Sequence, residues 1–218
     1  MSSKRDIVIQ REFSKWPKSY GKVGPPGIKI KKDFSKIHIK RQQMAIKNLD
    51  VKKGQKIIDV ACGVGKSLPI LSKKVGIDGE VVGIDITRGM IDESRKRTKQ
   101  LKNVILKKCG VDKIPFKAGS FDGVICTNAF HHFYKPVTML REIKRIMKKG
   151  GKIVIIDMSR DTKKAIALDT KLRDKEKGHH KFFSSKEIYG LFKRVGFYKI
   201  KIRLFSGKSE YVIIGQKV

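Results

Sequence analysis

From the run KIIDVAC at 56–62 onward, short apolar runs alternate with longer stretches that are apolar on one face only. The further short runs lie at 80–85, 103–109, 123–128 and 151–157. Apolar runs of about four to eight residues, rich in Val and Ile, are typical of strands buried in a parallel sheet. The stretches between them predict crossover helices at 66–75, 88–102 and 136–148.

The C-terminal part of the chain predicts a different connection. A helix at 184–195 is followed by two strand-like runs, FYKIKIRLF and SEYVIIGQ, which only three residues separate. Such a short loop allows a hairpin but is too short for a parallel crossover. The chain is therefore predicted to adopt an α/β, Rossmann-like, doubly wound fold, with a mostly parallel seven-stranded sheet and an antiparallel C-terminal hairpin.

The remaining segments are predicted to cover the edge of the sheet where a ligand binds. Residues 1–50 precede the sheet and are expected to form an N-terminal helical cover segment, and residues 51–218 the main domain. Residues 158–183 are too polar for a core and are expected to form a second part of the cover.

Composition fits a single globular domain inside the cell. The chain has 218 residues, of which 39% are hydrophobic and 33% charged. It has neither an apolar run of about 18 residues nor an N-terminal hydrophobic region typical of a signal peptide, so a cytoplasmic location without a transmembrane segment is expected. The three cysteines lack the spacing of a zinc site and are interpreted as buried thiols.

The charge is strongly positive but evenly distributed. There are 52 Lys and Arg residues against 20 Asp and Glu, a net charge of +32. The excess is +9 over residues 1–50, +14 over 51–160 and +9 over 161–218. A specific nucleic-acid site concentrates basic residues on one face. The even spread favours a proteome-wide bias or a non-specific attraction to polyanions such as nucleic acid or an anionic membrane surface.

The first predicted strand leads into a glycine-rich turn at 63–67 that ends in Gly-Lys-Ser. A phosphate-binding loop of NTPases needs a glycine where Val60 lies inside the strand. The dinucleotide fingerprint needs a third glycine where Leu68 stands. Nucleoside triphosphates and dinucleotides are therefore disfavoured as ligands, and Lys66 and Ser67 are interpreted as ordinary first-turn residues of a helix.

The pattern that remains is Asp59-x-Ala61-x-Gly63-x-Gly65, followed by Asp85 at the end of the second strand. A carboxylate at that strand end is well placed to accept hydrogen bonds from both hydroxyls of a ribose. Asp59 lies in a buried strand, where an isolated carboxylate is costly. It is expected to bond backbone N–H groups of the glycine turn or to lie near a positively charged ligand. The sequence thus predicts a ligand that contains ribose.

Several motifs occur in the order found in one enzyme family. They are DVACGVG, EVVGIDITRGM, CGVDKIPFKAGSFDGVICTNAFHHF, LREIKRIMKKGGKIVIID and, near the start, FSKWPKSYG. With the final helix and its two strands, they resemble the class I S-adenosylmethionine-dependent methyltransferases. Among these, the chain is similar to the ubiquinone/menaquinone-biosynthesis group (methyltransferase type 11).

The resemblance implies S-adenosyl-L-methionine as cofactor. Asp85 would bind its ribose, and Ile86 and Met90 would pack against its adenine. The remaining cofactor residues it implies are Asp59, Ala61, Gly63, Gly65, Gly110, Val111, Asp112 and Asn128.

The chain departs from the family pattern at two positions. Ala61 stands where the first glycine of the turn is usual, and it limits how closely the backbone approaches the methionine part of the cofactor. Gly110 stands where the family commonly has an acidic residue that meets the adenine amino group. Asp112, or the backbone around Val111, is expected to take its place.

The acceptor is expected beyond the fourth strand. His131 and His132 are candidates for a general base there, or for packing against and orienting the substrate. Candidate residues of a substrate pocket are Trp16, Tyr20, Phe130 and Phe133. His179 and His180 are adjacent but have no third ligand in view, so no metal site is expected.

The leading hypothesis is an enzyme that transfers a methyl group in line to a small-molecule or lipid/quinone-like acceptor. Such a transfer needs a positioned acceptor and exclusion of water, whereas a base is optional. The alternative is an RNA methyltransferase, which the basic surface suggests. A non-catalytic S-adenosylmethionine-binding protein is a third possibility, which the complete set of cofactor positions disfavours.

Overall fold

The structure, a computed structural model, describes residues 4–14 and 34–218. Seven strands form one sheet in these residues, in the spatial order β3-β2-β1-β4-β5-β7-β6. The strands are β1 (Lys56–Val60), β2 (Glu80–Asp85), β3 (Val104–Lys108), β4 (Phe121–Thr127), β5 (Met147–Met158), β6 (Phe197–Phe205) and β7 (Glu210–Lys217).

The predicted sheet is confirmed. Strands β1 to β5 are parallel, β7 is antiparallel to β5, and β6 is antiparallel to β7. The chain order reverses at β1, which lies between β2 and β4. In open α/β sheets, ligands bind outside the carboxyl ends of the strands at such a switch point.

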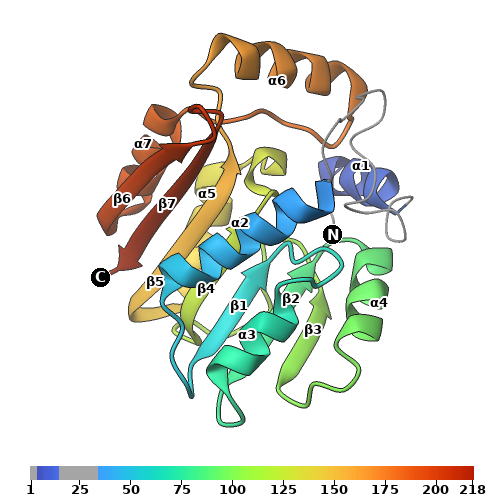
Figure 1. Cartoon of the computed structure of the whole chain (residues 1–218), viewed down its shortest axis with the longest axis vertical. Helices are drawn as coiled ribbons and strands as arrows, with labels where there is room; N and C mark the ends of the chain where they lie inside the picture. Colours follow the sequence, from blue (N-terminus) through green and yellow to red (C-terminus); the bar gives the residue numbers. More distant parts are fainter. Residues whose placement is uncertain (1–3, 15–33) are drawn as a thin grey trace.

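Helices cover both faces of the sheet (Figure 1). They are α1 (Lys4–Phe13), α2 (Phe34–Leu49), α3 (Leu68–Val75), α4 (Arg88–Arg97), α5 (Pro136–Ile146), α6 (Lys163–Lys175) and α7 (Ser185–Val195), with a 3₁₀ turn, η1, at Phe130–His132. One buried cluster joins α2, α3 and α4 to the sheet, and a second joins α5 and α7 to its other face.

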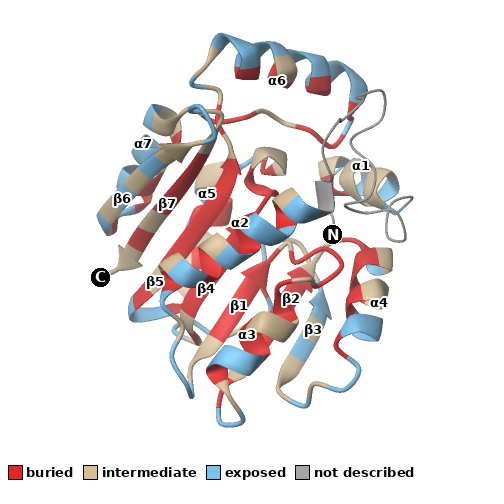
Figure 2. Cartoon of the chain, in the orientation of Figure 1, coloured by how far each residue is buried: buried red, intermediate tan, exposed pale blue. Residues whose placement is uncertain are grey.

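Burial follows position in the sheet (Figure 2). The central strand β1 is almost fully buried, which explains its continuous apolar run. The edge strand β3 is largely exposed and carries Lys107 and Lys108. Lysines on an exposed edge hinder pairing with the edge of another sheet.

The segments outside the sheet differ from the expectation in two ways. Helix α2 is not a cover, because Ala45, Ile46 and Leu49 are buried against the sheet. The 158–183 stretch contains the helix α6, which was not predicted and lies beyond the carboxyl edge of the sheet in Figure 1. Although the sequence of α6 is mostly polar, one stripe of the helix is buried and consists of Ala165, Asp169 and Leu172.

Gly65, in the turn after β1, is required by packing as well as by conformation. Its φ is +71°, and a Cβ atom there would overlap the side chain of Ser94 in α4 and approach Leu68 Cδ1 to 3.1 Å. We expect Gly65→Ala to lower the free energy of unfolding by about 2–4 kcal/mol, since left-handed strain and overpacking add. Urea unfolding followed by circular dichroism measures this loss.

Gly54→Ala is the matched control, because Gly54 has a φ of +76° and no atom within 4 Å of its Cβ position. We expect it to cost about 1 kcal/mol, since only the backbone strain applies. Equal losses in the two variants would show that the contact between the turn and α4 contributes nothing.

Candidate active site

A cavity of about 90 Å³, partly open to solvent, lies at the carboxyl edge of the sheet. The predicted residues found in its wall are Ala61, Gly63, Asp85, Ile86, Met90, Gly110, Val111, Asn128, His132 and Phe133. They come from the end of β2, the start of α4 and the segments that follow β1, β2, β3 and β4. Residues distant in the sequence therefore meet at the edge that the strand pattern indicates.

Five predicted residues lie outside this wall. Asp59 and Gly65 are buried behind the glycine turn, and Phe130 is fully buried in the core. Asp112 is exposed on a neighbouring groove. His131 lies beside His132, with a distance of 4.0 Å between their ring centroids.

Asp85 joins the two turns that border the cavity. Its Oδ2 accepts a hydrogen bond from the Gly63 N–H at 3.0 Å, and its Oδ1 accepts one from the Thr87 N–H at 2.8 Å. Burial raises the pKa of Asp85, and these hydrogen bonds partly oppose the rise. The glycine turn is held tightly, with Ala61 in the left-handed region at φ +58°.

Asp59 has a different partner from the one expected. It is 1% exposed and accepts a hydrogen bond from the Ser67 hydroxyl, and its Oδ1 has no partner among the residues that the structure describes. Burial raises the pKa of Asp59 to about 7, and the nearby Asp85 contributes to the rise. Ser67, interpreted from the sequence as an ordinary first-turn residue, is fully buried because it meets this carboxylate.

At the position where the family commonly has an acidic residue near adenine, this chain has Gly110. Asp112 is not in the described wall of the cavity, but its side chain lies close to Gly110. A Cβ atom on Gly110 would be only 2.6 Å from Asp112 Oδ1. The glycine at this position therefore leaves the space against which the Asp112 carboxylate packs. This contact supports Asp112 as the replacement, a role that stays a prediction.

Next to His132 of the cavity wall, Asp157 fixes the orientation of His131. Its Oδ1 lies 2.7 Å from His131 Nδ1, and it accepts hydrogen bonds from the N–H groups of His131 and Met158 at 2.9 and 2.7 Å. Burial alone would raise the pKa of Asp157, but His131 and these hydrogen bonds outweigh it and bring the pKa to about 2. Burial lowers the pKa of His131, but the adjacent Asp157 carboxylate raises it by more, so the pKa of His131 is higher than its ordinary value.

Further polar groups surround this pair. His132 Nδ1 lies 3.0 Å from the Gly178 carbonyl oxygen, and its Nε2 lies 3.8 Å from Glu176 Oε1. Burial lowers the pKa of His132 and raises that of Glu176 to about 7. His179 Nε2 lies 2.7 Å from the buried Asp169. Sequence reasoning missed the carboxylates, because the topology of the sheet and α6 brings them together.

Arg41 is a second residue that sequence reasoning missed. It lies on α2 with 7% exposure, and its Nε donates to Glu210 Oε2 at 2.6 Å. Its Nη1 donates to Asn128 Oδ1, which fixes a residue of the cavity wall. Helix α2 therefore contributes to the site by fixing the position of Asn128.

Helix α1 covers the cavity with Asp6, Ile9 and Phe13. The Phe13 ring packs edge-on against His132 at 4.9 Å between centroids, and Arg5 Nη2 donates to the His179 carbonyl oxygen at 2.9 Å. Helix α1 therefore contributes to the cavity wall, and a cover formed by the N-terminal segment stays a prediction. The two aromatic residues expected to join it, Trp16 and Tyr20, lie outside the described residues.

These features define a class of protein: a doubly wound sheet with a glycine-rich first turn and a carboxylate after the second strand is the layout of a nucleoside-binding α/β fold. A family model described as a methyltransferase domain matches residues 51–196. The chain therefore belongs to the methyltransferase-domain family and is an S-adenosylmethionine-dependent methyltransferase.

Known relatives agree with this assignment. A demethylmenaquinone methyltransferase of Staphylococcus aureus is 29% identical over 196 residues, which cover 81% of each chain. A SAM-dependent methyltransferase from Aquifex aeolicus has 26% identity and a TM-score of 0.66 over 84% of this chain and 93% of its own. A putative methyltransferase in complex with the Haloferax volcanii Trm112 activator shares the fold, with 18% identity and a TM-score of 0.80 over 95% and 96%.

Within the residues described, no helix combines the length and apolar character that crossing a membrane requires.

The position of Asp85 leads to a binding prediction. We expect Asp85→Ala to weaken S-adenosylmethionine and S-adenosylhomocysteine binding at least about tenfold, because a hydrogen bond to a charged group contributes about 1.5–3 kcal/mol. Calorimetry measures the affinity. Asp92→Ala, an exposed substitution on α4, is the control and should leave it unchanged. Unchanged affinity in Asp85→Ala would contradict the ribose assignment.

The buried Asp59 leads to a pH prediction. Its pKa is about 7 in the folded protein against an ordinary value of 3.8, so between these values the folded state holds the extra proton. Its contribution to the free energy of unfolding therefore falls as pH rises, by up to about 1.4 kcal/mol per pH unit. Asp59→Asn removes this dependence, so we expect its stability relative to the parent chain to increase from pH 4 to 7.

Urea unfolding across that pH range gives the comparison. Asp78→Asn, in the exposed turn before β2, is the control and should run parallel to the parent chain. If the Asp59→Asn curve also runs parallel to that of the parent chain, Asp59 titrates at an ordinary pKa and the assignment is wrong.

Proposed function

We propose that this methyltransferase acts on a small, mostly apolar acceptor of the quinol or phenol type. One observation carries the proposal. The cavity wall that the structure describes contains two carboxylates, Asp6 and Asp85, and no Lys or Arg side chain. The chain has 52 Lys and Arg residues, so a wall without them favours an acceptor that is not a polyanion.

The side chains at the His132 end of the cavity support the same class of acceptor. Ile9 and Phe13 from α1 line the cavity together with Phe133 and Met139, and His132 adds a polar group. An apolar pocket with few polar groups is the usual form of a small-molecule site. The Staphylococcus aureus relative is named for a quinone-type substrate, which agrees with this lining.

The described residues suggest how the chain would hold the two reactants. Asp85 would bind the ribose of S-adenosylmethionine, with Ile86 and Met90 against its adenine, and the bound cofactor supplies an electrophilic methyl group. The turn at Ala61 and Gly63 would position the methionine part. The cover by α1 would exclude water and hold the acceptor at near-attack distance, which is the main requirement of an in-line transfer.

The test is methyl transfer from labelled S-adenosylmethionine to a short-chain demethylmenaquinol, with an unrelated RNA as the competing acceptor. We expect label in the quinol and none in the RNA. RNA should bind at low salt and dissociate towards physiological salt, because spread positive charge gives affinity through counterion release. Label in one preferred RNA that persists at physiological salt would overturn the proposal.

A pair of variants on α1 tests the acceptor pocket directly. Phe13→Ala removes an aromatic wall residue, and we expect it to raise the KM for the quinol about tenfold or more with little effect on S-adenosylmethionine affinity. Ile7→Ala changes an exposed apolar residue of the same helix, 43% exposed, and should leave both unchanged. Equal effects of the two variants would place the acceptor elsewhere.

A further inference from the structure

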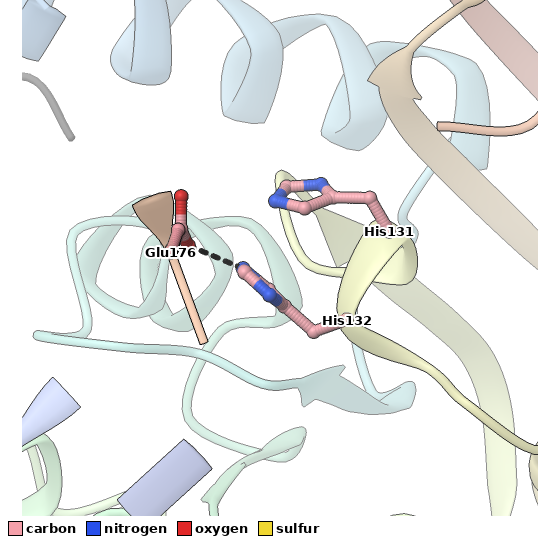
Figure 3. Close-up of side chains that lie close together, drawn as sticks. All are labelled: His131, His132 and Glu176. Carbon is pink, nitrogen blue, oxygen red and sulfur yellow. Dashed lines mark ion pairs between the residues drawn. The ribbon is translucent and has the colours of Figure 1, made fainter. Parts of the chain in front are cut away.

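We propose that His131, His132 and Glu176 bind a divalent first-row transition-metal ion beside the His132 end of the cavity. One nitrogen or oxygen atom of each residue lies within 4.8 Å of those of the other two. Figure 3 shows the two imidazole rings and the carboxylate converging from η1 and from the segment after α6. The sequence predicts no metal site, because the pair His179 and His180 has no third ligand in view; Glu176 is distant from His131 and His132 in the chain.

The two histidines present the nitrogen that a metal would need. A backbone carbonyl only accepts hydrogen bonds, so the contact with Gly178 places the proton of His132 on Nδ1 and leaves a lone pair on Nε2. His131 Nδ1 is likewise engaged, by Asp157 at 2.7 Å. Imidazole ligands usually donate their second N–H to a carbonyl or carboxylate, which fixes the ring orientation. Both arrangements are present here.

Glu176 provides the independent observation. Its residue is 5% exposed, and no residue in the described part of the chain donates a hydrogen bond to its carboxylate. A carboxylate removed from water without a hydrogen bond is costly, and coordination to a cation is one way to compensate it. Its Oε1 lies 3.8 Å from His132 Nε2, within the same cluster.

The local charge also favours a cation. Asp157 and Glu176 both lie near His131, although the chain carries only 20 acidic residues against 52 basic ones. A cation bound among these residues would be attracted by both negative charges.

A modest movement would complete the coordination. Two ligands that are each about 2.1 Å from a tetrahedral ion lie about 3.4 Å apart. The present separations of up to 4.8 Å exceed this value by at most about 1.4 Å, and the 3.8 Å between His132 Nε2 and Glu176 Oε1 exceeds it by about 0.4 Å. Glu176 follows the last residue of α6, where a side-chain rotation leaves the helix intact.

Two imidazoles and one carboxylate suit Zn²⁺, Fe²⁺, Mn²⁺ or Co²⁺ better than Ca²⁺ or Mg²⁺, which prefer oxygen ligands. Three protein ligands leave further coordination positions open, and His132 borders the cavity. On the proposed function, an acceptor oxygen would bind at such a position, and the ion would favour its anionic form. This last step depends on the acceptor being a quinol or phenol, whereas the metal site does not.

The test uses the full chain, freed of metal, and titrates it with Zn²⁺ by calorimetry and with Co²⁺ by visible absorbance. We expect saturable binding of one ion per chain. Glu176→Gln and His132→Ala should each weaken binding at least tenfold, and Asp157→Asn, which acts through His131, about tenfold.

His180→Ala is the matched control, since His180 lies beside the cluster but offers no ligand to it. It should bind Zn²⁺ as the parent chain does, and melting curves should show that the isosteric Glu176→Gln variant is folded. Absence of saturable binding, or equal affinity in Glu176→Gln and the parent chain, would overturn the metal site. Neither result depends on methyl transfer, so failure of the quinol assay leaves this test unaffected.

Discussion

Three carboxylates at the carboxyl edge of the sheet, two of them buried and one half-buried, constrain the whole site. Asp59 and Asp157 are the penultimate residues of β1 and β5, and Asp85 is the last residue of β2. A charge so placed loses its hydration and needs a partner or a proton. Each carboxylate obtains a different one: Ser67 and a raised pKa for Asp59, two backbone N–H groups for Asp85, and His131 for Asp157.

The contacts of these three carboxylates fix the shape of the cavity before any ligand binds. The Asp85 contacts tie the glycine turn to the start of α4, so the backbone that would face the cofactor is already in place. The Asp157 contacts orient His131 and, through the neighbouring His132, bring ring nitrogens towards Glu176. Preorganisation of this kind avoids reorganisation at the moment of reaction. The cost of burying acids is thus offset by polar groups that point at the ligand site.

The parts of this arrangement that local pattern determines were predictable from the sequence. Apolar runs identified the parallel strands, and the short loop before residue 209 identified the hairpin. The end of β2 placed Asp85 at the cavity. What could not be predicted depends on long-range packing: the amphipathic stripe of α6 is weak because its buried positions include Asp169, and Glu176 meets His132 only after α6 folds over the sheet edge. The partner of Asp59 was missed for a related reason, since Ser67 in a glycine-rich turn is as compatible with an ordinary helix start as with a buried hydroxyl.

The surface charge and the cavity impose separate constraints on function. A net charge of +32 spread over the chain acts at long range, and it influences which polyanions the protein meets. The cavity acts at contact distance, and its described wall offers apolar side chains and carboxylates to whatever enters. A polyanion attracted to the surface would therefore have to leave the favourable potential and desolvate its phosphates against Asp6 and Asp85. A neutral, mostly apolar acceptor has no such penalty, so the same basic surface is compatible with a small-molecule enzyme.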